Sequence, residues 1–231
     1  AREIAEESII LLKNEGELLP LSADKKIAFI GKYAAKPRYQ GGGSSNINSY
    51  RVTSALDAVS GNANILYSPG FTDEGPDEKM LRNAIETAQQ AEVAVIFAGL
   101  PDSFESEGYD RKHMNLPDWQ NELIASVSHV QPNTVVVLHN GSAVEMPWIA
   151  SVSAVLEAYL GGQEVGAAVV NILFGKTNPS GRLAETFPLR LEDNPSYLSF
   201  GKDNEQVDYS EGVFVGYRYY ESKAMEVLFP F

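Results

Sequence analysis

Carboxylates and aromatic side chains are concentrated in one short segment, PDSFESEGYDR. Glu105 and Glu107 lie two residues apart in it, Phe104 and Tyr109 accompany them, and Arg111 ends the segment. Aromatic rings can cover the apolar faces of sugars, and carboxylates can act as general acids and bases. Repulsion between the two carboxylates would raise one pKa, as a general acid requires, whereas pairing with Arg111 would lower it. The segment is typical of a carbohydrate site, although a solvated acidic loop has the same composition.

A second polar loop, YQGGGSSN, contains three consecutive glycines at positions 41–43. Glycine lets the backbone approach a ligand closely, and Ser44 and Ser45 offer hydrogen bonds to hydroxyl groups. Because the loop lacks GxGxxG, a P-loop lysine and an obvious helix directly after it, support for a phosphate cradle is weak. A flexible surface turn is the other interpretation. Ser44 and Ser45, together with Tyr109, are the candidate substrate-binding residues.

Five apolar runs separated by helical patterns must position these loops. Continuous β-branched runs without polar alternation are typical of a parallel sheet covered on both faces. The expected strands are 26–31, 64–68, 92–100, 134–139 and 154–159. The helical patterns begin at Asp77, Pro117 and Gln163. We therefore predict one flavodoxin-like α/β domain over residues 1–231, with an open, mostly parallel sheet and helices on both faces.

Two further elements are expected at the ends of this domain. Ile4 and the run from Ile9 to Leu12 predict an amphipathic helix that starts at the first residue. Residues 182–187 predict an antiparallel edge strand near the C-terminal part. In open α/β sheets, ligands bind outside the carboxyl ends of the strands. Since both polar loops follow predicted parallel strands, we expect them to meet at one edge and to form one wall of a cleft.

Composition excludes several functions. The formal net charge is −13, so there is no surplus of basic residues to neutralise nucleic acid or an anionic membrane. Without cysteine there is no disulfide and no cysteine zinc site. His113, His129 and His139 lack metal-ligand spacing, and Ser44 lacks the context of a nucleophile elbow, so we predict no metal, no cofactor and no catalytic triad. His139 is expected to pack at a strand end. No apolar run reaches membrane-span length and no signal peptide is visible, which leaves the location open with the cytoplasm slightly favoured.

Several motifs in one order carry a family resemblance. They include ESIILLKNEGELLPL, YQGGGSSNIN, FESEGYDRKHMNLP and YLGGQEVGAAVVNILFGKTNPSGRLAETFP. Over nearly its whole length the chain resembles the C-terminal α/β sandwich of family 3 glycoside hydrolases, of the bacterial β-glucosidase and β-xylosidase type. In that family a TIM barrel supplies a nucleophilic Asp and the sandwich supplies the acid/base Glu. The resemblance assigns the acid/base role to Glu105, with Glu107 as the alternative.

The resemblance implies a retaining, exo-acting enzyme that hydrolyses terminal β-D-glucosides or β-linked oligosaccharides. The barrel would be an intramolecular partner of this chain. We interpret the two ends of the sequence as cuts within a longer protein, with a barrel before and a β-sandwich after, so the fragment alone would be inactive. A flavodoxin-like nucleotide- or flavin-binding module and a non-catalytic structural domain are the alternative functions.

Overall fold

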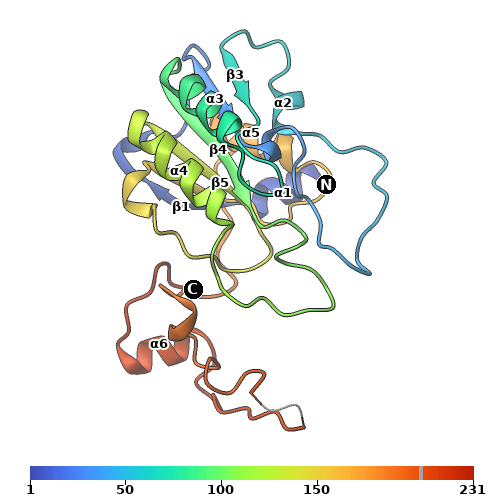
Figure 1. Ribbon diagram of the computed structural model, residues 1–231, viewed down its shortest axis with the longest axis vertical. Coiled ribbons are helices and arrows are strands. Elements are labelled where there is room, and N and C mark those ends of the chain that lie inside the picture. The colour runs from blue at the N-terminus through green and yellow to red at the C-terminus, as the bar shows by residue number, and fades with distance from the viewer. Residues whose placement is uncertain (203–204) are drawn as a thin grey trace.

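The computed structural model describes residues 1–202 and 205–231. A six-stranded sheet forms the middle layer of an α/β sandwich, between two layers of helices (Figure 1). The strand order is β1-β6-β5-β4-β2-β3. Only β1 is antiparallel to its neighbour, β6. The five parallel strands follow the flavodoxin-like order, in which the first and third strands are neighbours. The strands are β1 Ile10–Asn14, β2 Ile27–Ile30, β3 Ile65–Ser68, β4 Val93–Gly99, β5 Thr134–His139 and β6 Ala154–Glu157.

Helices cover both faces of the sheet, with α3 and α4 on one side and α1, α2 and α5 on the other (Figure 1). The α-helices are α1 Arg2–Ser8, α2 Ala55–Ala58, α3 Glu78–Gln89, α4 Asp118–Val130, α5 Val165–Leu173 and α6 Tyr217–Lys223. The 3₁₀ helices are η1 Glu15–Glu17, η2 Lys32–Ala34, η3 Ile149–Ser151 and η4 Leu191–Asp193. Asp77 starts α3 because its carboxylate accepts hydrogen bonds from the amides of Lys79 and Met80, both at 2.9 Å.

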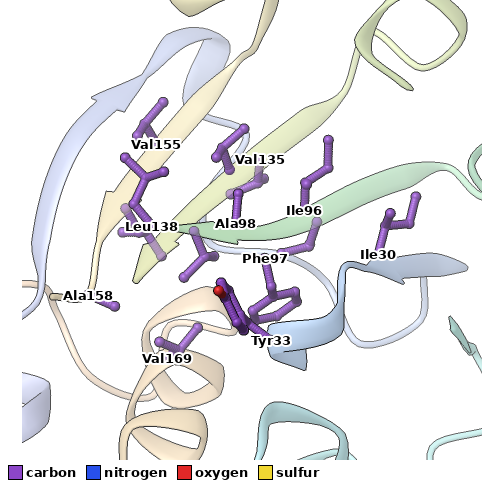
Figure 2. Close-up of a cluster of buried hydrophobic side chains, with 14 of the residues drawn as sticks. Ile30, Tyr33, Ile96, Phe97, Ala98, Val135, Leu138, Val155, Ala158 and Val169 are labelled. Atoms are coloured by element: carbon purple, nitrogen blue, oxygen red, sulfur yellow. The ribbon is translucent and has the colours of Figure 1, made fainter. Parts of the chain in front are cut away.

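Burial on both faces of the sheet explains why the central strands are continuous apolar runs in the sequence. Every residue of β2, β4, β5 and β6 is buried, since each strand is covered on both faces. Phe29 and Phe97 pack with ring centroids 5.1 Å apart. Figure 2 shows Tyr33 of η2 and Val169 of α5 close to Phe97 on one face of the sheet. This rigid layer fixes the strand ends from which the functional loops leave.

The five predicted parallel strands and the presence of an N-terminal helix are confirmed, but the extent of that helix and the edge strand expected at residues 182–187 are wrong. The N-terminal helix ends at Ser8, and Ile10–Asn14 forms the antiparallel edge strand β1, in which Ile10 lies opposite Glu157. Residues 182–187 do not form a strand of the sheet. Phe187 makes only an isolated antiparallel bridge to Phe229. The antiparallel edge strand therefore exists, at the N-terminal rather than the C-terminal part.

The segment around α6 lies apart from the sandwich layers (Figure 1). It is attached through the Phe187–Phe229 bridge and through the Leu191 amide, which donates to the Glu145 carboxylate at 3.3 Å. Large apolar side chains are exposed along it, at Leu198, Phe200, Val207, Tyr209, Val213, Phe214 and Val215. In the described part of the chain, no helix combines the length and the apolar character needed to cross a membrane.

Candidate active site

The glycine-rich loop and the carboxylate loop pack directly against each other. They follow β2 and β4, which are parallel neighbours at the point where the strand order reverses, the usual ligand edge of such a sheet. The Glu107 amide points to the Gly42 carbonyl at 3.5 Å, and the Ser44 amide donates to the Glu107 carboxylate at 2.5 Å. The prediction that both loops lie on one edge is confirmed.

Gly43 makes this close contact possible. Its φ is 93°, and a Cβ atom there would lie 2.6 Å from Oε2 of Glu107 and even closer to the Glu107 Cβ. Gln40 holds the ends of the same loop together: its amide nitrogen donates to the Ile47 carbonyl at 3.0 Å, and its amide oxygen accepts from the Ile47 nitrogen at 3.1 Å. The loop is thus a closed unit that presents backbone to Glu107.

We predict that Gly43→Ala separates the two loops. The added methyl group must displace Glu107, and the left-handed backbone adds strain. Gly61→Ala is a matched control, because Gly61 has a similar φ of 85° but no atom within 4 Å of the added Cβ. In the full-length protein we expect Gly43→Ala to lower kcat/KM about tenfold more than Gly61→Ala does, by the misplacement of one reacting group. Equal effects of the two substitutions would show that the loop contact is irrelevant to activity.

Hydrogen bonds from Arg38, Gly141 and Ser142 hold Glu105 in place. Arg38 donates to its Oε2 atom at 2.5 Å and to its backbone carbonyl at 2.8 Å. The Gly141 amide donates to Oε2 at 2.7 Å, and the Ser142 hydroxyl donates to Oε1. Burial raises the pKa of Glu105, but these hydrogen bonds outweigh it and hold the pKa below its usual value. The side chain is only 17% exposed.

Glu107 stands in the opposite environment. Its side chain is exposed, and in the described residues no cation forms an ion pair with it. Hydrogen bonds from Ser44 lower the pKa of Glu107. The expected rise of one of the two carboxylate pKa values is therefore wrong for this chain on its own: Glu105 and Glu107 are not each other's main neighbours. Of the two carboxylates, Glu107 is the more exposed.

The other predicted residues lie around the same edge. Ser44 and Ser45 are exposed, and Tyr109 is half-exposed with its hydroxyl donating to the Asp102 carbonyl. Arg111 approaches Glu105 at 4.0 Å and donates to the Ser142 hydroxyl at 2.6 Å. All of these belong to one polar surface above the strand ends.

His139 is not part of this surface, whereas His113 is exposed and its ring packs against Phe104 with centroids 5.7 Å apart. His139 is buried in the core, where its ring packs near Tyr33 and Phe97 with centroids 6.0 Å and 6.4 Å away. Burial lowers the pKa of His139 to about 4, so the ring is neutral. The expected packing role of His139 is confirmed.

Sequence analysis did not identify Glu157, a buried carboxylate near Glu105. Glu157 ends β6 with no exposed surface, accepting from the Asn140 amide at 3.0 Å and from the Tyr159 nitrogen at 2.9 Å. Burial raises the pKa of Glu157 to about 8, and the nearby Glu105 and Glu185 add to the rise. A charged residue inside an otherwise apolar strand, AVLEAY, was the available signal. Asn140 also donates to the Ser142 carbonyl at 2.9 Å, so Glu157 supports the turn that binds Glu105.

Among the described residues, no group of three His, Asp or Glu side chains is arranged to hold a metal ion. The arrangement can instead support proton transfer by an exposed carboxylate, next to backbone amides and hydroxyls that can bind sugar hydroxyls.

Residues 9–217 match the family model described as the glycosyl hydrolase family 3 C-terminal domain. The chain belongs to this family. It is 53% identical to "Thermostable beta-glucosidase B" of Acetivibrio thermocellus, an alignment that covers 100% of this chain and 31% of that protein. It is 43% identical to "Exo-alpha-(1->6)-L-arabinopyranosidase" of Bifidobacterium longum, again over 100% of this chain and 32% of that protein.

The solved structures agree with the family 3 assignment. A Bifidobacterium adolescentis GH3 β-glucosidase superposes with a TM-score of 0.95 at 44% identity, covering 100% of this chain and 34% of the other. The chain thus spans about a third of the length of these relatives. The family resemblance read from the motifs is confirmed. Membership in a glycosidase family argues against the nucleotide- or flavin-binding alternative.

Proposed function

We propose that this chain is the acid/base-bearing domain of a retaining, exo-acting β-glycosidase that removes terminal β-D-glucosyl residues. The observation that carries the proposal is the exposed carboxylate of Glu107, which lies at the carboxyl-end edge of β2 and β4 and accepts a hydrogen bond from the Ser44 amide. The β-glucosidase name of a 53% identical relative supports the substrate class. The nucleophilic Asp of the proposed mechanism would come from a barrel domain outside these 231 residues.

Of the two candidate carboxylates, we assign the acid/base role to Glu107 and keep Glu105 as the other candidate. An acid/base must reach the glycosidic oxygen and change its charge during each cycle. Arg38 favours the carboxylate form of Glu105, so protonating Glu105 would weaken the closest ion pair of a buried cation. Glu107 has no such constraint. A second carboxylate about 5–5.5 Å away, as a retaining site requires, would raise the pKa of Glu107 toward neutrality.

In the proposed first step the Asp attacks the anomeric carbon and the bond to the leaving oxygen breaks. Glu107 donates its proton to that oxygen. In the second step Glu107, now a carboxylate, takes a proton from water while the water oxygen attacks the anomeric carbon and releases the Asp. Ser44, Ser45 and Tyr109 would bind sugar hydroxyls beside it. No cofactor takes part in this sequence of steps.

Exposed apolar side chains support the proposal that another domain packs against this chain. The C-terminal segment exposes several large apolar side chains, such as Phe200, Val213 and Phe214, and exposed apolar patches often mark contacts with another protein surface. We propose that the remainder of the full-length protein, including the barrel, covers part of this segment and brings the Asp to Glu107.

The test is an assay of the full-length protein on aryl β-D-glucosides, aryl β-D-xylosides and aryl α-L-arabinopyranosides. The last substrate belongs in the panel because an arabinopyranosidase is 43% identical over the whole chain. We expect the glucoside to be turned over fastest. The isolated 231-residue chain should turn over none of them, because one of two required carboxylates is missing. Turnover by the purified chain alone, comparable to that of the full-length protein, would contradict the proposal.

A further inference from the structure

Arg38 is the most buried cation at the candidate site, with a side chain only 6% exposed. It lies in the segment between η2 and the glycine-rich loop, and its guanidinium crosses to the carboxylate loop. There Nη1 donates to Oε2 of Glu105 at 2.5 Å, Nη2 donates to the Glu105 carbonyl at 2.8 Å and Nε donates to Asp102 at 3.3 Å. One side chain thus joins the loops that follow β2 and β4.

The hydrogen bonds from Arg38 hold the main chain of Glu105 as well as its side chain. The Glu105 amide donates to the Pro101 carbonyl at 3.1 Å, so Arg38 completes a turn whose start is set by the end of β4. Glu107 comes two residues later, and Ser44 is the only residue of the described chain that donates a hydrogen bond to its side chain. The position of Glu107 therefore depends on the turn held by Arg38 as well as on its contact with the glycine-rich loop.

We propose that Arg38 is a positioning residue for Glu107, acting through Glu105 and the turn from Pro101. The proposal rests on the proposed acid/base role of Glu107. Arginine suits this role because its planar fork offers several donors in fixed directions, whereas lysine offers a single charged point. Since Glu105 would be left as a buried charge without its main partner, loss of Arg38 must shift the turn or admit water.

The test uses the full-length protein and two glucosides, one with a dinitrophenyl leaving group and one with a simple alkyl leaving group. A displaced acid harms only the substrate whose leaving oxygen needs a proton. We expect Arg38→Met to lower kcat/KM about 100-fold for the alkyl glucoside and only a few-fold for the dinitrophenyl glucoside. Arg38→Lys should show a smaller loss with the same selectivity. Arg82→Met, at an exposed arginine of α3, is the matched control and should leave both values unchanged.

A second arm places Arg38→Met in a Glu107→Gln background. If Arg38 acts through Glu107, the additional loss should no longer depend on the leaving group. Thermal melting of each variant separates misfolding from misplacement, and Arg38→Lys retains the charge if Arg38→Met does not fold. Equal losses on both substrates, or a selective loss that persists in the double variant, would overturn the positioning role. If Glu107→Gln alone is not selective, it is instead the proposed function of Glu107 that fails.

Discussion

Replacing Glu107 by Gln in the full-length protein is expected to slow turnover of glucosides with poor leaving groups by about 10²–10⁴-fold. Gln cannot donate a proton to the leaving oxygen or accept one from water. Substrates with activated leaving groups should lose far less in the glycosylation step. Added azide, which attacks without a base, should restore part of the turnover on them. Steady-state kinetics on a series of aryl glucosides, with product analysis for the glucosyl azide, measure all three effects.

Glu105→Gln is the comparison that separates the two carboxylates. Because Glu105 is held by Arg38, Gly141 and Ser142, its neutral variant should disturb the loop and cause a smaller loss without azide rescue. The opposite outcome, in which Glu105→Gln alone shows the leaving-group dependence and the azide product, would transfer the acid/base role to Glu105.

The second large effect concerns the dependence of stability on pH. Glu157 has a pKa of about 8 in the folded chain, whereas the pKa of an exposed Glu carboxyl lies near its ordinary value of 4.5. Between these values the folded state keeps a proton that the unfolded state has lost. Stability is therefore lost as the pH rises through this window, by up to about 1.4 kcal/mol per pH unit. Below the window the carboxyl is protonated in both states and the effect is absent.

Glu157→Gln cannot ionise and removes this loss. Urea unfolding of the chain at pH 5 and pH 8 should show the variant gaining stability over the parent as the pH increases. Glu86→Gln, at an exposed position of α3, is the control and should give a difference that does not change with pH. A pH-independent difference for Glu157→Gln would mean that Glu157 is already ionised inside the fold.

Much of the fold follows from the sequence because the dominant signal is local. Runs such as TVVVLH consist of β-branched residues without alternation, and only a doubly covered parallel strand buries all of them. The placement of the two loops on one edge followed from that topology alone. The edge strand did not, because the run from Ile9 to Leu12 fits a helix and a strand equally, and pairing of Ile10 with Glu157 in β6 decides between them.

The sequence pointed to the carboxylate loop, but not to the residues that hold Glu105 or to the pKa shifts that they cause. Residue types near Glu107 identified the carboxylate loop, yet the partners of Glu105 lie 67 and 37 positions away along the chain, at Arg38 and Ser142. Such contacts exist only after three strand ends have been brought to one edge. The pKa directions depend on them, which is why the repulsion expected from sequence spacing was overridden by long-range hydrogen bonds.

The closure of the glycine-rich loop by Gln40 has a consequence for altering this protein. Because both hydrogen bonds of that amide fix Ile47, the ends of the loop are set independently of the side chains between them. The side chains of Ser45 and Asn46 lie between these ends and are exposed. Directed evolution can therefore vary these two positions without moving the Ser44 backbone amide that faces Glu107.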